Sequence, residues 1–197
     1  MSNKRLFLFP ILLLFCGYGA RAQRTVAEYH TTIEHYLAQS DFQNSITVLT
    51  QLRQHYERAA DSQGVLTTQL KTAEVLQLQG EDAAVVELLE TTVKNEFNHP
   101  PDSLFALVYH KLGVGYFYIY EERKAIAAYE KSLRIREQIF PPQHPAIAKS
   151  NYNIGVAYFE LGEPAISNQY LLRSAEIYRQ LDTPKRLIRN YLALAKN

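Results

Sequence analysis

The side chains that could perform acid–base or metal chemistry are spread thinly along this chain. His30 and His35 are five residues apart, so a helix would not place them on one face as a pair of metal ligands requires. The adjacent acids Glu81–Asp82 and Glu121–Glu122 stand at expected turns or helix starts, where carboxylates interact favourably with the helix dipole. General acid–base catalysis needs two such groups in one sheltered cleft. We therefore expect no catalytic residues, no metal site and no cofactor.

Motifs for phosphate binding and nucleophilic catalysis do not appear either. Gly113-x-Gly115 has no third glycine and follows no expected strand, so it does not predict a dinucleotide-binding loop, and there is no nucleophile elbow. The cluster Arg123, Lys124, Arg134 and Arg136 is small and is typical of a solvated helix face. With 21 basic and 20 acidic residues the net charge is +1, which argues against a nucleic-acid partner.

The first 22 residues predict a secretory signal peptide. A basic head, Lys4–Arg5, precedes the apolar run Leu6–Phe15, and Ala20-Arg21-Ala22 is a suitable cleavage site before Gln23. The apolar run is short for a transmembrane helix, although an uncleaved anchor is the alternative. Attachment of lipid at Cys16 is disfavoured because the preceding residue is the bulky Phe15. We expect an exported protein, periplasmic or extracellular, without a membrane span after cleavage.

Cleavage would change the chemistry of the mature chain in two ways. It leaves 18 basic against 20 acidic residues, a net charge of −2. It also removes Cys16, the only cysteine, so the mature chain would have neither a disulfide nor a thiol nucleophile. Stability then has to come from packing.

The clearest pattern in the chain is an internal repeat. The hexapeptide 112–117, LGVGYF, returns 42 residues later as IGVAYF at 154–159, and the same offset takes Ser132 to Ser174. Weaker copies lie upstream at spacings of 40, 40 and 42 residues: Tyr36-x3-Ser40, Leu76-x3-Gly80, Tyr116-x3-Tyr120 and Tyr158-x3-Gly162. Each copy contains two segments with apolar residues at helical spacing, joined by a short polar turn. A β-strand over 113–120 is the alternative, favoured by glycine and aromatic content, but it leaves the repeat unexplained.

The pattern Tyr109-x2-Leu112-Gly113-x2-Tyr116, followed by Ala125-x3-Tyr129, resembles the tetratricopeptide repeat (TPR). The long spacing and the His-Pro turn before the next first helix resemble the kinesin-light-chain variety. The resemblance implies an all-α, right-handed α-solenoid of about four helix-turn-helix units. The expected boundaries are a signal peptide at 1–22, an array over 23–197, units at 25–60, 63–98, 102–140 and 144–181, and a terminal helix at 184–196.

Small and aromatic residues in the repeat are expected to pack the units. Gly113 should stand where the two helices of its unit approach most closely, with Ala125 as the matching small residue. The packing residues predicted in this way are Gly113, Tyr116, Ala125, Gly155 and Tyr158. Pro145 and Pro184 suit first helical positions, with His144 and Thr183 before them as caps, Thr183 being the better cap chemically.

The resemblance also implies a function, namely binding of a protein or peptide on the concave face formed by the first helices. The groove candidates are His110, Val114, Phe117, Lys149, Tyr152, Asn153 and Phe159. In related repeats an asparagine at the place of Asn153 helps to hold peptide backbone. The alternative for the apolar groove residues, including Val156, is that they pack between neighbouring units.

Three readings of the whole chain follow from the resemblance. The first is a non-catalytic, exported scaffold or adaptor. The second is the N-terminal sensor fragment of a larger enzyme, a CHAT-type protease or a sensor histidine kinase. The third is self-association through the C-terminal helix, in which Leu192 would occupy the place of Ile154 and no partner helix follows.

Overall fold

The computed structural model describes residues 24–95 and 102–196, and the predicted signal peptide lies outside them. Within these ranges the chain forms nine α-helices and no strand. They are α1 (Val26–Ala38), α2 (Phe42–Arg58), α3 (Ser62–Gln79), α4 (Asp82–Asn95), α5 (Ser103–Tyr118), α6 (Glu122–Ile139), α7 (Pro145–Glu160), α8 (Pro164–Gln180) and α9 (Pro184–Leu194). The all-α solenoid is confirmed, and a strand over 113–120 is excluded. None of the described helices combines the length and apolarity needed to cross a membrane.

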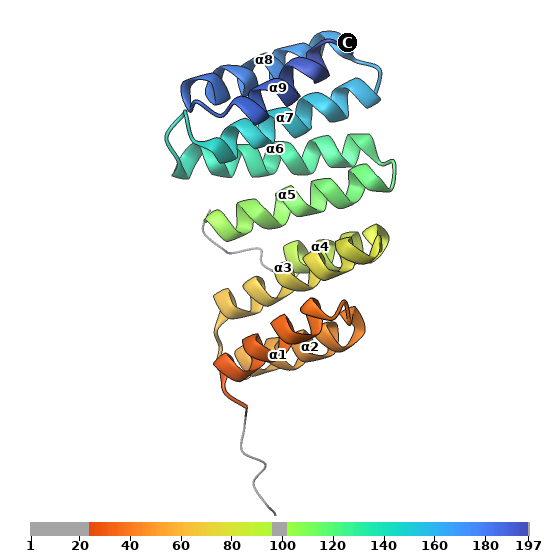
Figure 1. The fold of residues 1–197 in the computed structure, drawn as a ribbon, viewed down its shortest axis with the longest axis vertical. Coiled ribbons are helices and arrows are strands. Elements are labelled where there is room, and N and C mark those ends of the chain that lie inside the picture. The colour runs from red at the N-terminus through yellow and green to blue at the C-terminus, as the bar shows by residue number, and fades with distance from the viewer. Residues whose placement is uncertain (1–23, 96–101, 197) are drawn as a thin grey trace, which may run out of the picture.

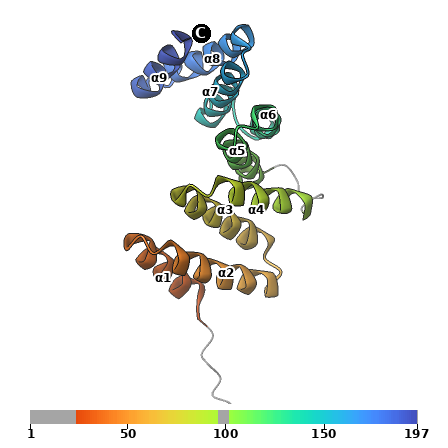
Figure 2. The same cartoon turned by 90° about the vertical axis from the view of Figure 1, so that its right-hand side faces the viewer.

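The helices stack in chain order into one elongated body, from α1 and α2 at one end to α9 at the other (Figure 1). The view at 90° shows that the stack bends, so that its two ends lean toward the same side (Figure 2). Helices α1 and α9 lie toward that hollow side, whereas α6 lies toward the outer side (Figure 2). Each helix packs against the next one in the chain, as expected for a repeat array.

Several helices begin at a residue whose short polar side chain accepts a hydrogen bond from a backbone N–H group of the first turn. Thr25 and Glu28 form a reciprocal capping box at α1. A carboxylate caps each of α2, α3 and α5, namely Asp41, Asp61 and Asp102.

Of the two predicted caps that precede a proline, His144 and Thr183, only the first makes a cap hydrogen bond. The His144 Nδ1 atom accepts the Ala146 N–H at 3.2 Å, so histidine is a working cap for α7. The Thr183 side chain makes no cap bond and instead donates to the Tyr178 carbonyl at 3.1 Å. The prediction that Thr183 would be the better cap is therefore wrong. The stacking of the His144 ring on Phe140, with centroids 3.9 Å apart, holds the imidazole in its capping position.

Each pair of helices is joined by a tight turn that contains a residue in the left-handed region. The repeat places Ser40, Gly80, Tyr120 and Gly162 at this position, with φ values of +56°, +76°, +62° and +82°. Glycine takes this conformation freely, whereas other residues are strained in it. Tyr120 is the bulkiest residue of the four.

The repeat period reappears as recurring contacts between helices. The Ser132 Oγ of α6 donates to the Ala106 carbonyl of α5 at 2.7 Å, and 42 residues later Ser174 of α8 donates to Ala148 of α7 at 2.8 Å. All four of these residues are buried. The same offset in sequence therefore produces the same packing of one helix pair.

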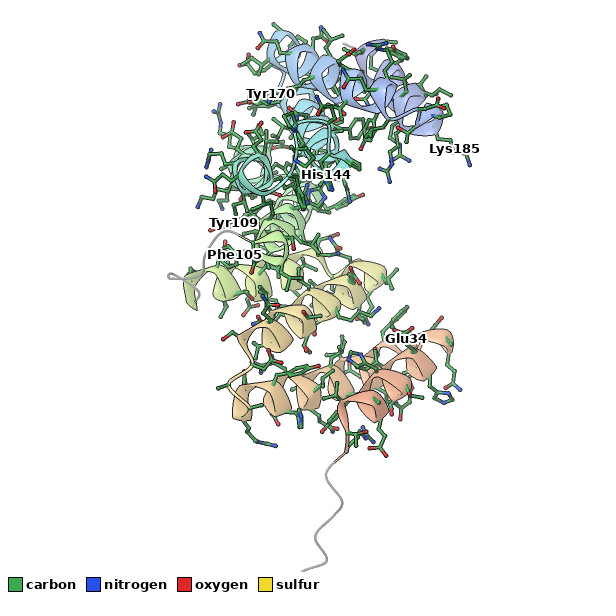
Figure 3. The ribbon with its side chains drawn as sticks, turned by 90° about the vertical axis from the view of Figure 1, so that its left-hand side faces the viewer. Glu34, Phe105, Tyr109, His144, Tyr170 and Lys185 are labelled. Atoms are coloured by element: carbon green, nitrogen blue, oxygen red, sulfur yellow. The ribbon has the colours of Figure 1, made fainter. Side chains whose placement is uncertain are left out.

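The glycines of the first helices lie against large side chains of the second helices. A Cβ on Gly113 would stand 2.5 Å from the Tyr129 ring, and one on Gly155 would stand 2.7 Å from Leu171. Ala125 is fully buried beside this contact. Tyr116 is also buried and donates its hydroxyl to Glu90 of the preceding unit. Tyr109, in the place of the usual tryptophan, packs edge-on against Phe105 with centroids 5.3 Å apart (Figure 3).

The apolar core is divided into two clusters. A small cluster joins α1 and α2 and reaches α3 only through Val75. A large cluster runs without interruption from α3 to α8 and includes Ile154 and Leu89. The first helix pair therefore has an apolar cluster that is largely separate from that of the rest of the array.

Helix α9 continues the repeat, in a register one residue away from the expected one. Pro145 and Pro184 both begin helices, and Asn151 and Asn190, six residues further on, are both buried. Each asparagine donates to the carbonyl four residues earlier, at 2.9 and 3.0 Å. This equivalence places Ala193, and not Leu192, at the position of Ile154. Leu192 is consequently exposed on the hollow side of the stack.

Candidate functional site

The predicted groove residues lie on α5 and α7, but one of them is not at the surface. His110 is 2% exposed and packs against the Tyr129 ring, with centroids 5.6 Å apart. The prediction that His110 lines a groove is therefore wrong. Burial, followed by the nearby cations Arg136, Lys149 and Lys111, holds the pKa of His110 well below its usual range. Its Nδ1 atom has no hydrogen-bond partner within the described chain.

Some of the apolar groove candidates pack between units and others line an open pocket. Val114 and Phe117 of α5 pack against the large core cluster. Tyr152, Val156 and Phe159 of α7 instead line an open pocket. The two explanations, packing between units and exposure in a groove, thus apply to different repeats.

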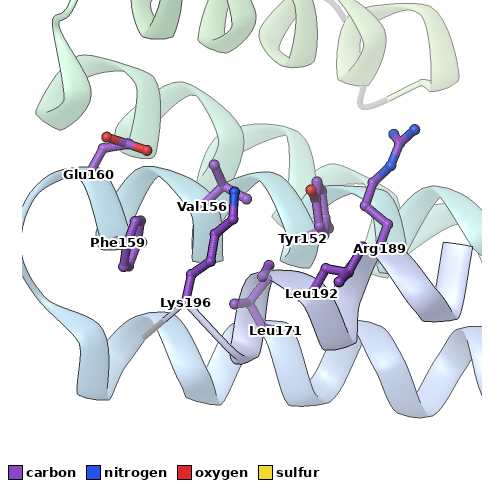
Figure 4. A pocket seen from close by; sticks show the side chains of 9 residues that line it. Tyr152, Val156, Phe159, Glu160, Leu171, Arg189, Leu192 and Lys196 are labelled. Carbon is purple, nitrogen blue, oxygen red and sulfur yellow. The ribbon is translucent and has the colours of Figure 1, made fainter.

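This pocket lies between α7 and α9 and has a volume of about 260 Å³. Figure 4 shows Tyr152, Val156 and Phe159 from α7 on one side and Leu192 from α9 on the other, with Leu171 of α8 behind them. Sites for drug-sized ligands usually have volumes of roughly 300–1,000 Å³. The space therefore suits one or two side chains better than a whole cofactor.

Charged side chains stand around this apolar lining. Arg189 of α9 and Lys196, two residues beyond the end of α9, border the pocket, and Glu160 borders its other end (Figure 4). Neither cation forms an ion pair with a residue in the described ranges. Burial raises the pKa of the Tyr152 hydroxyl, and the guanidinium of Arg189 acts in the opposite direction. The pocket thus combines apolar walls with two cations that form no ion pair with the described residues.

The positive charge extends from the pocket toward the middle of the stack. Lys149 of α7 is exposed, but partial burial and then Arg136, Lys111 and Arg186 lower the pKa of its ammonium. Arg136 is buried and donates to the Ala146 carbonyl at 3.0 Å and to Ser150 Oγ at 2.7 Å. Its burial lowers the pKa of the guanidinium to about 10. Within the part of the chain that the structure describes, neither Lys149 nor Arg136 has a carboxylate partner.

The first half of the stack has a different distribution of charge. Lys71 of α3 contacts Glu34 of α1 at 3.5 Å and Glu74 of its own helix at 4.0 Å. Glu74 in turn contacts Lys111 of α5 at 3.2 Å. Figure 3 shows Glu34 near α3, at the start of this series. We call the surface that carries Glu34, Lys71, Glu74, Lys111 and Lys149 the inner face.

Asn153 makes a contact that its sequence position does not reveal. Its side-chain amide lies near the hydroxyl of Tyr129 and acts to lower the pKa of that hydroxyl. Tyr129 is the residue of α6 whose ring fills the space beside Gly113. A partner backbone that used Asn153 would therefore have to share this amide with Tyr129.

Sequence reasoning missed the contribution of α9 to the site. Arg189, Leu192 and Lys196 line the pocket, although none of them was among the predicted groove residues. The alignment of Pro184 with Pro145 was the signal that could have found them, because it places Leu192 at the position of the groove candidate Asn153. In the described ranges, no three His, Cys, Asp or Glu side chains gather as metal ligands.

Comparison with known proteins agrees with this geometry. The tetratricopeptide repeat family matches residues 104–180, and no curated protein matches the sequence. The kinesin-light-chain TPR-like repeats of Podosopora anserina share the fold with a TM-score of 0.68 and 18% identity, over 87% of both chains.

Two further solved structures are similar over most of this chain. MamA has a TM-score of 0.57 and 15% identity, over 86% of this chain and 90% of its own. The Rap protein in complex with Competence and Sporulation Factor has a TM-score of 0.58 and 18% identity, over 85% of this chain and 46% of its own. Residues 104–180 are thus similar to the tetratricopeptide repeat family, and the described chain as a whole has the fold of kinesin-light-chain repeats.

Proposed function

We propose that this protein is a non-catalytic, exported scaffold that binds a segment of a protein partner on its inner face, in the pocket between α7 and α9. The observation that carries the proposal is that the apolar side chains of Tyr152 and Leu192 stand beside Arg189 and Lys196, which form no ion pair within residues 24–95 and 102–196. Apolar anchors provide most of the binding energy in such interfaces, while charged groups provide specificity. The Rap structure, with its bound Competence and Sporulation Factor, shows that this fold can carry a ligand.

The charges define the chemistry of the partner segment. Lys149, Arg186 and Arg189 lie together and repel other cations, so a segment with an aspartate or glutamate is favoured. The pocket volume of about 260 Å³ fits a large apolar side chain close to that acid. We therefore expect an extended segment in which an aromatic or aliphatic residue lies near a carboxylate.

Selection of binding peptides from a random display library on the purified full chain tests this proposal. Enriched sequences should combine an acid with a large apolar residue, and their affinity should fall as salt is raised, because salt screens exposed charges. The double variant Tyr152→Ala/Asn153→Ala should lose at least about tenfold in affinity, which corresponds to removal of roughly 1.4 kcal/mol.

A matched variant controls for the general loss of positive charge. Arg134→Gln removes one exposed cation from α6, outside the pocket, and should bind the selected peptides like the parent protein. Arg189→Gln removes the same charge at the pocket and should bind them more weakly. Equal binding of the peptides by the parent and by the Tyr152→Ala/Asn153→Ala variant would reject this groove.

Export is the second part of the proposal and rests on the sequence of residues 1–22. Intact-mass measurement on the protein recovered from a bacterial host tests it directly. A product that begins at Gln23 and is released with the periplasmic fraction is expected. A cytoplasmic product that retains residues 1–22 would contradict export without affecting the proposed groove.

A further inference from the structure

The turn between α5 and α6 presents aromatic side chains to solvent in a way that the fold does not require. Tyr118 is 61% exposed and Tyr120 is 84% exposed. Tyr120 also has a φ of +62°, at the position where two other units have glycine. Burial therefore gives these rings no stabilising role, and the backbone conformation is unfavourable for a tyrosine.

These rings form the wall of a second pocket, about 240 Å³ in volume, on the edge of the stack. Phe117, Tyr118 and Tyr120 line it together with two carboxylates, Glu122 at the start of α6 and Glu160 at the end of α7. The rings of Phe117 and Tyr118 lie edge to face, with centroids 6.0 Å apart and planes at 82°. No lysine, arginine or histidine is among the lining residues.

The two carboxylates have no cationic partner within the described chain. Glu121, the neighbour of Glu122, contacts Lys124 at 3.4 Å, but neither Glu122 nor Glu160 forms an ion pair there. Aromatic faces attract cations through the ring quadrupole, and carboxylates add direct charge attraction. A neutral apolar ligand would leave both acids unused, and an anion would be repelled by them.

We propose that this pocket binds the guanidinium of an arginine in the partner segment. A guanidinium is planar, stacks on aromatic rings and is more weakly hydrated than an ammonium, so it suits tyrosine walls with acids at their rim. This inference rests on the proposed function, since Glu160 borders both pockets and one extended segment can reach from one to the other. The partner would then carry an acid and an apolar residue at one end of the segment and an arginine at the other.

Titration of the isotope-labelled full chain with N-acetyl-arginine amide, followed by NMR, tests the assignment without a known partner. The ring signals of Tyr118 and Tyr120 should shift saturably at millimolar concentrations of this probe. N-acetyl-lysine amide should bind at least about twofold more weakly, and the neutral N-acetyl-norleucine amide should cause no saturable shift. Glu160→Gln and Tyr120→Gly should each weaken binding of the arginine probe by about fivefold or more.

A matched charge variant separates this site from general attraction to an acidic surface. Glu163→Gln removes one exposed acid three residues beyond Glu160 that does not line the pocket, and it should leave arginine binding unchanged. Equal loss on Glu163→Gln and Glu160→Gln, or equal shifts with norleucine and arginine, would overturn the proposal. Because the probe carries neither an acid nor a large apolar group, that failure would leave peptide binding at Tyr152 and Arg189 standing.

Discussion

The two halves of the inner face are built on the same repeat but differ in whether their charged side chains form ion pairs. From α1 to α5, lysines and glutamates pair with each other, Lys71 with Glu34 and Glu74 with Lys111. From α7 to α9, Lys149 and Arg189 have no acid partner within the described residues. The first half pairs its own charges, and the second half has cations that are not paired within the described residues. In the proposed account, the binding surface of an array of similar helices is the one whose charges the array itself does not neutralise.

The apolar cores divide the stack at a different place, after the first helix pair. The first helix pair has a small cluster of its own, while α3 to α8 share one continuous core. In linear arrays, stability is roughly the sum of the units and of their nearest-neighbour interfaces. The first pair should therefore open before the rest, and the binding half should remain folded when it does.

Truncation of a buried residue in each of the two apolar clusters should have the largest effect on stability. The comparison should show whether the two clusters unfold independently. Ile154→Ala, at a fully buried site in the large cluster, should cost about 2–5 kcal/mol of global unfolding free energy. Leu49→Ala in the small cluster should lower the protection of α1 and α2 while sparing α5 to α8. Hydrogen exchange measured residue by residue distinguishes these results. Uniform loss of protection in both variants would show that the two cores act as one.

Overpacking of the glycine contact should have the next largest effect. Gly113→Leu forces a side chain into the Tyr129 ring, which a Cβ alone would already approach to 2.5 Å, and should destabilise by about 1–3 kcal/mol. Ala127→Leu adds the same bulk at an exposed site of α6 and should stay within about 0.5 kcal/mol of the parent. Urea unfolding followed by circular dichroism measures both. An unchanged midpoint for Gly113→Leu would mean that the Tyr129 ring moves away without cost.

Acid should destabilise the protein through His110, which lies in the middle of the stack. The folded state holds the pKa of His110 well below its ordinary value of 6.5, because of burial and the cations Arg136, Lys149 and Lys111. The unfolded chain therefore binds more protons below about pH 6.5, and stability falls as pH drops below that value. His110→Phe should flatten this part of the curve of unfolding free energy against pH. An equally steep slope in that variant would assign the acid sensitivity to other groups.

Disruption of the charge pairs in the first half should have the smallest effect. Glu34→Gln breaks the contact with Lys71; the Glu34 side chain is largely exposed and the Lys71 side chain is partly exposed, so we expect a loss of no more than about 0.5 kcal/mol. Thermal unfolding at low and high salt measures it. A loss of several kcal/mol would show that the paired series stabilises the stack, and does not simply neutralise its inner face.

Much of the fold could be predicted from the sequence because the residues that recur in the repeat are the ones that pack the helices together. Gly113 and Gly155 mark close helix contacts, and the 42-residue offset recurs in the hydrogen bonds of Ser132 and Ser174. Local caps were harder to predict, since His144 caps α7 only because Phe140 stacks on it, while the Thr183 hydroxyl bonds elsewhere. Whether a residue caps a helix therefore depends on side chains and carbonyl groups that lie outside that helix.

The site was less predictable, because exposure depends on how far neighbouring helices turn toward each other. His110 and Lys149 were both expected on the groove surface, yet the former is buried against Tyr129 and the latter is exposed. The alignment of the terminal helix with the repeat was one residue out of register. For this reason Leu192 and Arg189 were not predicted as groove residues. A difference of one residue turns a helix by about 100° and so exchanges buried and exposed positions.

The most direct test of the account is the affinity of a display-selected acidic peptide for two matched charge reversals. Lys149→Glu acts on the unpaired half of the inner face, and Lys71→Glu acts on the paired half. Fluorescence polarisation at low salt should show at least about a thirtyfold loss for Lys149→Glu and less than about a threefold change for Lys71→Glu. Equal losses in the two variants, or a larger loss in Lys71→Glu, would contradict the assignment of binding to the half whose charges are unpaired.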